Sequence, residues 1–403
     1  MDIIFSSAKK QIELIHNKKI SSYELTKTYL DRIKNLDSNL NSFLYINEEN
    51  ALEIAKEKDD QIAKGIINGK LFGLPIAIKD LTPIKGMPTT SGSLLEKDNI
   101  AEFDNLEFER IKTHGPVILG KTNTPEFGLM GHTENLLKDH CRTPWNHGKS
   151  AGGSSGGAGS AVAAGFCSIA MGGDAGGSIR IPSSYNGIFG IKPTQGRVPR
   201  RAFPVHNMIS QGGPMTRYVE DSALMLEIIS GFSSEDPSSM HKPPIQFEDE
   251  FWEYSVKEYF QKKHSKKQLN IAWIDNFGSV TPNTEIKTSC LDALSQLEKD
   301  GHTITPVKFE LNEIFKSWFN IFSVGTYIGH EEDYKKNKKK FAWYTQEAFE
   351  NAINLTATEY AQSVLKLKEV QLKFSEMFQK YDMIASPTMP TTAFDVGNPP
   401  QEI

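Results

Sequence analysis

The segment that most constrains the fold is residues 148–196, which are dense in Gly, Ser and Ala. That composition is typical of a flexible linker. A linker, however, would not contain the apolar runs 161–164 and 188–191. In addition, six of the chain's eight arginines lie within 142–217, where planar, multi-donor hydrogen bonding suits the bracing of loops. We therefore predict a rigid loop scaffold inside a folded domain.

The sequence around this segment predicts an α/β fold. From Leu71, short apolar strands such as 75–78 and 117–119 alternate with helical stretches and with loops rich in Gly and Ser. Alternation of this kind favours a sheet with helices packed on it. The first 65 residues are expected to form a helical covering layer, because a capping box of Ser21 and Glu24 precedes an amphipathic run.

The C-terminal half carries fewer signals. A strand is expected at 270–274 and a helix near 285–299. A further helix should begin at Thr356, where Glu359 completes a second capping box. Its apolar residues recur at helical spacing, and we expect this stripe to be core packing: Val364, Leu367, Val370, Phe374 and Phe378.

Composition argues against several classes of function. A net charge of −5 and a pI near 6.1 over 403 residues give no electrostatic case for a nucleic-acid partner. Three scattered cysteines and dispersed histidines match no disulfide framework or metal-ligand spacing, so we expect no metal and no cofactor. The N-terminus has no signal-peptide pattern and no apolar stretch reaches membrane-spanning length, so we expect a soluble, cytoplasmic protein with no membrane partner.

Residues 115–122, GPVILGKT, formally match the phosphate-loop pattern. A phosphate loop offers consecutive flexible N–H groups to an anion, whereas Pro116 has no N–H and 117–119 favours a buried strand. We therefore predict a strand here and no nucleotide site.

Three short segments carry residues suited to nucleophilic chemistry. In LPIAIKD at 74–80 an apolar strand ends in Lys79, which places an amine at the edge of a sheet where α/β sites commonly form. In AGGSSGGAG at 151–159 two adjacent serines lie among glycines. In GGDAGGSIRIP at 172–182 the glycines allow successive backbone N–H groups to face one cavity, directly before Ser178.

In order and spacing these segments resemble the amidase signature family, and the likeness continues through GIFGIKPTQGRVPR and GGPMTRYVEDSALML. The resemblance implies a hydrolase of carbon–nitrogen amide bonds with Ser178 as nucleophile, Ser154 as the bridging serine and Lys79 as the distal base. Ser-Lys machinery is a known variant of the serine triad and needs neither histidine nor metal. The resemblance also implies a cis peptide bond between Gly153 and Ser154.

The chemistry gives other residues of these segments expected roles. An attacked amide carbonyl develops oxyanion charge, which preoriented N–H groups stabilise, so Ala175, Gly176 and Gly177 join Ser178 as a predicted oxyanion hole. A lysine acts as a base at neutral pH only where burial or cationic neighbours keep it neutral. Supporting roles in hydrogen bonding and loop bracing are expected for Ser155, Asp174 and Arg180.

The resemblance covers residues 20–231 well and 270–400 loosely, and it implies one α/β domain over 1–403. The implied fold is a large, twisted, mixed β-sheet covered by helices on both sides. We expect three parts, an N-terminal helical layer over about 1–65, a signature core over about 71–231 and a C-terminal part over 232–403. Two departures stand out. The family usually has Thr where Gly173 stands, and it continues beyond ASPTMPTTAFDVGNPP, so the C-terminal part is expected to lack the family's final segment.

The resemblance leaves three functions open. NTPEFGLMGH and SIRIPSSYNG are more similar to stand-alone amidases, which makes a stand-alone amidase the leading interpretation. Its partner would be a small-molecule amide, without nucleic acid, and a homodimer is the candidate assembly. The main alternative is a glutaminase like the glutamyl-tRNA amidotransferase A subunit, which would need a tRNA and a second protein chain as partners. The second alternative is a truncated, non-catalytic member.

Overall fold

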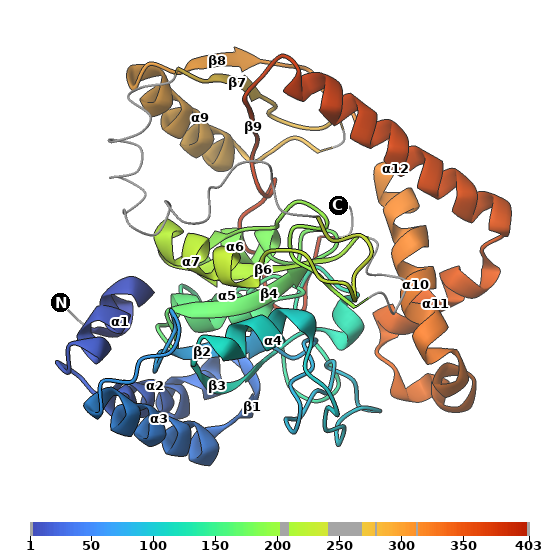
Figure 1. The fold of residues 1–403 in the computed structure, drawn as a ribbon. Helices are drawn as coiled ribbons and strands as arrows, with labels where there is room; N and C mark the ends of the chain where they lie inside the picture. The colour runs from blue at the N-terminus through green and yellow to red at the C-terminus, as the bar shows by residue number, and fades with distance from the viewer. Residues whose placement is uncertain (1–2, 202–208, 241–267, 279, 312, 401–403) are drawn as a thin grey trace.

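The computed structural model describes residues 3–201, 209–240, 268–278, 280–311 and 313–400. At its centre is a six-stranded mixed sheet in the order β1-β3-β2-β4-β6-β5 (Figure 1). β3 and β4 run parallel to β2, whereas the three outer strands are antiparallel to their neighbours. The strands are β1 (Phe43–Ile46), β2 (Pro75–Lys79), β3 (Val117–Thr122), β4 (Ile169–Asp174), β5 (Phe189–Gly190) and β6 (Gln211–Thr216). The expected large mixed sheet is confirmed.

Helices that precede, separate and follow the strands in sequence pack against the central sheet. α2 (Ser22–Leu36) and α3 (Glu48–Ala63) pack on each other and on β3, α5 (Gly156–Ala163) packs on β2 and β4, and α7 (Val219–Ile229) packs on β6. The predicted capping box opens α2, because Ser21 Oγ accepts from Glu24 N–H while the Glu24 carboxylate accepts from Ser21 N–H. The other helices of this region are η1 (Ile3–Phe5), α1 (Ala8–His16), η2 (Asp37–Asn39), α4 (Leu106–Thr113), η3 (Glu126–Gly128) and α6 (Arg180–Asn186).

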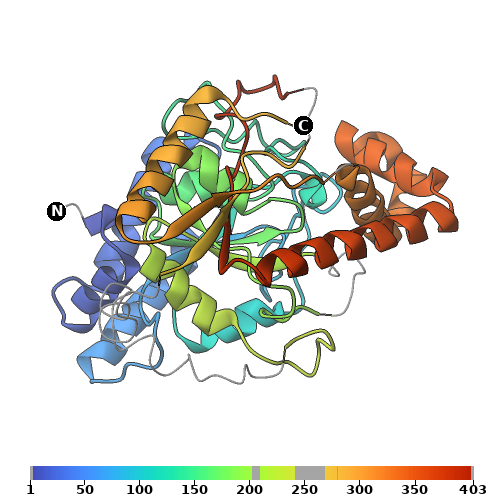
Figure 2. The same cartoon turned by 90° about the horizontal axis from the view of Figure 1, so that it is seen from above.

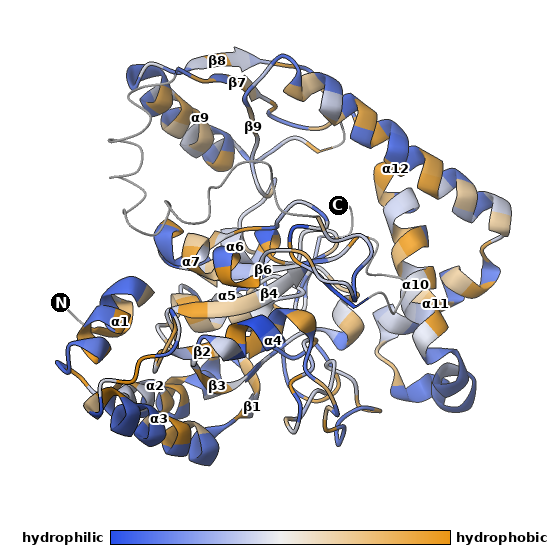
Figure 3. Cartoon of the chain, viewed as in Figure 1, coloured by the Kyte–Doolittle hydropathy of each residue, from blue (hydrophilic) through white to orange (hydrophobic). Residues whose placement is uncertain are grey.

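The central strands form the buried core, as their apolar composition predicts. Every residue of β2 and β3 is buried. The strand predicted within GPVILGKT is confirmed, and it extends through Lys121 to Thr122. In Figure 3 the covering helix α3 is largely hydrophilic, with hydrophobic residues at intervals. Only one side of that helix therefore needs to meet the core.

A second, separate sheet follows in the chain. β7 (Asn270–Trp273) lies between β8 (Thr303–Pro306) and β9 (Met383–Ala385), and both neighbours run parallel to it. α9 (Thr284–Lys299) contacts β8 (Figure 2). The strand and helix expected in this region are confirmed, but their separation from the central sheet was not predicted.

Between β8 and β9 the chain forms three further helices, α10 (Ile314–Asn337), α11 (Trp343–Asn354) and α12 (Ala357–Phe378), with η5 (Lys338–Lys340) between the first two. α10 contacts both α11 and α12. The second predicted capping box, Thr356 with Glu359, is present at the start of α12. No helix in the described ranges combines the length and apolarity required to cross a bilayer.

The expectation that the apolar stripe of α12 is core packing is wrong. None of its five residues is buried, and Phe378 is 57% exposed. Figures 1 and 2 place α12 at the edge of the molecule, where α10 is its main neighbour. Phe374 contacts the rings of Phe277 and Phe309, with centroids 6.5 and 4.9 Å away. Helical spacing predicts which residues share a face but not how much of that face another element covers.

Candidate active site

Lys79 ends β2 and is buried, with 2% of its surface exposed. Its Nζ donates a hydrogen bond to Ser154 Oγ at 2.7 Å. Burial lowers the pKa of Lys79 to about 7, because the charged amine loses its hydration; Asp174 opposes this shift and Arg200 adds to it. A large fraction of the Lys79 amine is therefore neutral near pH 7.

Ser154 and Ser155 lie at the turn that leads into α5. The peptide bond between Gly153 and Ser154 is cis, as predicted. The Ser155 hydroxyl donates to the Gly173 carbonyl at 3.2 Å and accepts from the Gly173 N–H at 3.3 Å. The Ser155 N–H donates to the Ser178 carbonyl at 3.1 Å. Ser155 thus joins the two serine loops to each other, while its neighbour Ser154 contacts the amine.

Asp174 organises the turn that carries Ser178. Its fully buried carboxylate accepts from the N–H groups of Gly177 at 2.8 Å and Ile179 at 3.1 Å. The Arg180 guanidinium adds two hydrogen bonds, at 2.8 and 2.9 Å. Burial would raise the pKa of Asp174, but the paired guanidinium and the N–H donors outweigh it and hold the pKa below its usual range. The turn is therefore built around a carboxylate that stays ionised.

The predicted oxyanion donors fall into two groups. The Gly177 N–H already donates to Asp174, so it is occupied. The N–H groups of Ala175, Gly176 and Ser178 meet no acceptor among the residues that the structure describes. These three are the groups free to donate to a developing oxyanion.

A cavity of about 270 Å³ brings the predicted catalytic residues together, because Lys79, Ser154 and Ser178 all line it. Of the predicted oxyanion residues, Ala175 lines this cavity, whereas Gly176 and Gly177 do not. The supporting residues Ser155, Asp174 and Arg180 do not line it either. Among the described residues, Ser178 forms no side-chain hydrogen bond with Ser154. The remaining walls are Leu81, Thr82, Pro83, Ser91, Phe103, Asn105, Glu107, Phe127, Gly128, Gly172, Gly173, Ala175, Arg200, Arg201, Ser210, Gly212, Phe322, Thr326 and His330.

α10 contributes to this cavity, which the sequence did not predict. Phe322, Thr326 and His330 lie four residues apart on one face of the helix and line the cavity wall. The His330 ring stacks on the Phe127 ring, with centroids 3.9 Å apart. The four-residue spacing was a readable signal for one helix face, but nothing in the sequence indicated that this face meets the serine loops.

The polar pair Glu107 and Arg200 was also missed. Glu107 is 2% exposed, and its Oε1 lies 3.7 Å from Arg200 Nε. Burial raises the pKa of Glu107, and the Arg200 cation partly offsets this. Gly212 lies directly against this carboxylate, because a Cβ there would be 2.2 Å from Glu107 Oε1. Arg200 ends the family-like segment GIFGIKPTQGRVPR, but nothing in the sequence indicated that Glu107 would lie beside it.

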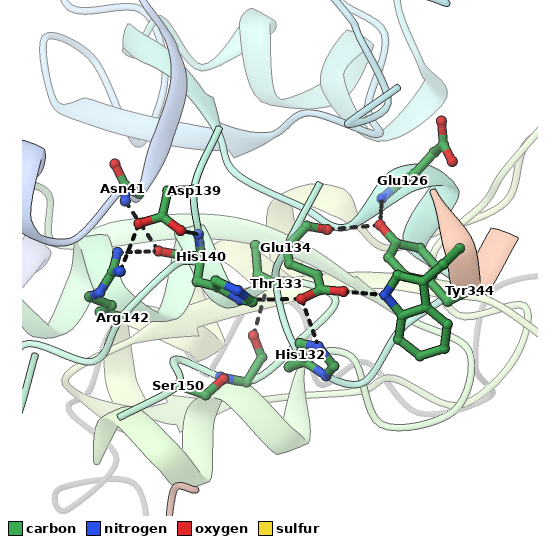
Figure 4. A network of polar contacts seen from close by, with 12 residues as sticks. Asn41, Glu126, His132, Thr133, Glu134, Asp139, His140, Arg142, Ser150 and Tyr344 are labelled. Carbon is green, nitrogen blue, oxygen red and sulfur yellow. Dashed lines mark hydrogen bonds and ion pairs between the residues drawn. The ribbon is translucent and has the colours of Figure 1, made fainter. Parts of the chain in front are cut away.

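A polar network attaches α11 to the loop that follows η3 (Figure 4). Tyr344 OH accepts from the Glu126 N–H at 2.7 Å and donates to the Glu134 carbonyl at 2.8 Å. Glu134 also accepts from Trp343 Nε1–H at 2.8 Å and faces the His132 ring at 3.4 Å. Hydrogen bonding by His132 lowers the pKa of Glu134, against the effect of its partial burial. The network thereby attaches α11 beside η3, whose Gly128 lies close to Ser154, because a Cβ on that glycine would be 3.2 Å from Ser154 Oγ.

No group of three or more His, Cys, Asp or Glu side chains within the described ranges is arranged to hold a metal ion. The structure places at the cavity the Lys79 amine, the Ser154 and Ser178 hydroxyls and, from the Ser178 turn, the residues Ala175 and Ser178.

Comparisons with known proteins identify the family of this chain. The Amidase family model matches residues 24–402. The A subunit of the glutamyl-tRNA(Gln) amidotransferase of Clostridium botulinum (strain Alaska E43 / Type E3) is 32% identical over 423 residues, which cover 98% of this chain and 85% of that protein. An acylamidase of Rhodococcus erythropolis is 33% identical over 392 residues, which cover 96% of this chain and 80% of that protein.

Solved structures give the same picture. A bacterial aryl acylamidase of the amidase signature family superposes with a TM-score of 0.88 at 25% identity, covering 98% of this chain and 82% of that one. A 6-aminohexanoate cyclic dimer hydrolase superposes with a TM-score of 0.85 at 25% identity, covering 98% of this chain and 81% of that one. The chain therefore belongs to the amidase signature family and is a hydrolase that acts on carbon–nitrogen amide bonds.

Proposed function

We propose that this protein is a stand-alone amidase that hydrolyses a small-molecule amide through an acyl-enzyme on Ser178. One observation carries the proposal. The buried Lys79 amine, with its pKa lowered to about 7, lies 2.7 Å from Ser154 Oγ in the cavity that Ser178 also lines. A neutral amine in contact with a hydroxyl is the arrangement that a lysine base requires.

In the proposed reaction, Ser178 Oγ bonds to the amide carbonyl carbon while its proton passes to Ser154, whose own proton passes to Lys79. The carbonyl oxygen becomes an oxyanion, and the N–H groups of Ala175, Gly176 and Ser178 donate to it. Such a donor typically lowers the activation free energy by about 3–4 kcal/mol. When the carbon–nitrogen bond breaks, Lys79 returns a proton through Ser154 to the leaving amine. Water then hydrolyses the acyl-enzyme through the same relay.

Labelling tests the nucleophile without knowledge of the substrate. A fluorophosphonate should add to the intact chain once, and peptide mass mapping should place the adduct on Ser178. Ser178→Ala should abolish the adduct while the fold is retained. Absence of labelling in the folded wild-type chain, together with no turnover on a panel of aliphatic, aryl and cyclic amides, would favour a non-catalytic member instead.

The similarity to amidotransferase A subunits supports a second candidate, a glutaminase that works only with a partner protein. The two functions differ in what the isolated chain does. A stand-alone amidase hydrolyses simple amides as a pure protein, whereas the second candidate would release ammonia from glutamine only after its partner is added. We propose the stand-alone function without a nucleic-acid partner, and light scattering on the pure chain tests whether it forms a homodimer.

A further inference from the structure

The Trp318 side chain touches the loop that carries the proposed oxyanion donors, although it comes from α10, outside the Gly- and Ser-rich segments. Its indole Nε1–H donates to the Ala175 carbonyl at 2.9 Å. Its ring occupies the space beside Gly176, because a Cβ on that glycine would lie 2.5 Å from the indole. We propose that Trp318 is a positioning residue that orients the Gly176 N–H for oxyanion stabilisation; this rests on the proposed function.

The orientation follows from the planarity of the peptide group. In a trans peptide the carbonyl and the next N–H point in opposite directions. The bond between Ala175 and Gly176 is not among the cis bonds of the described chain. When the indole holds the Ala175 carbonyl, it therefore also fixes the direction of the Gly176 N–H, which meets no acceptor among the described residues.

The loop is held at two points, and Trp318 provides the second. Asp174 fixes its far end through the Gly177 N–H at 2.8 Å. Without the indole, the peptide between Ala175 and Gly176 has no side-chain hydrogen bond among the described residues. Gly176 is exposed and lacks a side chain, so its backbone dihedrals are restricted only weakly by sterics. An oxyanion donor is effective only when it is already aimed before the charge develops.

The indole is itself held in place by aromatic packing. The Trp318 ring stacks on Phe322, with centroids 5.2 Å apart and planes 18° apart. Phe322 is 6% exposed and lines the cavity. Phe322, which lines the cavity, and Trp318, which holds the oxyanion loop, thus lie on adjacent turns of α10. This helix therefore contributes to the reaction as well as to the shape of the cavity.

The rate of fluorophosphonate labelling tests this proposal, because phosphonylation of Ser178 places a phosphoryl oxygen where the oxyanion would develop. Trp318→Phe keeps a ring but removes the N–H. We expect its maximal labelling rate to fall about tenfold, less than the roughly 10²–10³ that follows loss of an entire donor. The concentration for half-maximal labelling should stay within about twofold. Trp318→His, which keeps a ring N–H, should recover part of the rate.

Trp343→Phe is the matched control. It removes another indole N–H donor, but one that bonds Glu134 and is 57% exposed. We expect its labelling rate to stay within about twofold of the wild type. A Trp318→Phe rate equal to that of the wild type or of this control would overturn the proposal, as would equal losses in Trp318→Phe and Trp318→His. A variant that no longer melts cooperatively would also count against it, since the indole would then support the fold. An unlabelled wild-type chain would instead reject the proposed function.

Discussion

Replacing Lys79 by methionine should stabilise the protein at pH 7 while removing its activity. The pKa of this amine falls from 10.5 to about 7 on burial, so between these values the folded chain binds fewer protons than the unfolded chain. The resulting penalty is fully present below pH 7 and disappears as pH rises through 10.5. At about 1.4 kcal/mol for each pKa unit, it amounts to about 4 kcal/mol at pH 7.

Methionine has a similar length and no charge, so it removes that penalty. It leaves the Ser154 hydroxyl without its 2.7 Å partner, which costs about 1–2 kcal/mol. The expected net gain in the free energy of unfolding is about 2–3 kcal/mol at pH 7, shrinking toward zero or below near pH 10. Turnover should fall by about 10²–10⁴, the usual contribution of a general base.

Urea unfolding of the wild type and Lys79→Met at pH 7 and at pH 9.5 measures the two free energies. Lys27→Met is a suitable control, because the side chain of Lys27 is 53% exposed and pairs with Asp31 on the surface. The control should show no stabilisation at either pH. If Lys79→Met is less stable than the wild type at pH 7, or if its difference from the wild type does not change with pH, the amine is not held neutral by burial.

Three further predictions follow from the same contacts. In the wild type, kcat/KM for a neutral amide should rise with pH around 7 and then stay high, as the Lys79 amine loses its proton; Arg200→Gln should move this rise to higher pH, because the Arg200 cation lowers that pKa. Asp174→Asn should move the rise to lower pH and reduce kcat about tenfold or more, because it removes an anion and loosens the turn at Gly177. Glu134→Gln should lower stability by about 1 kcal/mol above pH 4.5, measured by hydrogen exchange in α11, and this loss should fade as pH falls from 4.5 through the lowered pKa that the carboxyl has in the fold.

Most of the local structure near the site could be predicted because it depends on short-range chemistry. The Ser21 and Thr356 capping boxes are decided by residues three apart, and both are present. The apolar composition of β2 and β3 predicts burial on both faces, which is what these strands have. The cis bond before Ser154 came from the family resemblance and not from the residues themselves.

What could not be predicted depends on contacts between distant segments. The face of α10 that lines the cavity has ordinary helical spacing, and its meeting with the Ser178 loop joins residues over 140 positions apart, as with Trp318 and Ala175. The Gly177 N–H looked like an oxyanion donor, but the buried Asp174 carboxylate takes it, a choice that depends on how tightly the turn closes. The prediction that the apolar stripe of α12 is buried was wrong for the same reason, because the exposure of a helix face depends on neighbouring elements that the local sequence does not specify.

Two buried lysines lie on adjacent strands, and their partners decide which one can be a base. Lys121 Nζ donates to the Thr82 carbonyl at 2.7 Å and to Thr89 Oγ1 at 3.0 Å, and it lies 3.4 Å from Asp80 Oδ1. Burial lowers its pKa to about 8, against the pull of the Asp80 carboxylate, so at pH 7 it stays mostly protonated. Lys121→Met would strand that carboxylate in the interior, and we expect a loss of about 3–5 kcal/mol in the free energy of unfolding. Lys79→Met should change stability in the opposite direction. Urea unfolding of both variants at pH 7 measures the two changes in stability. Equal free energies of unfolding would contradict the assignment of Lys121 as a structural cation and Lys79 as a neutral base.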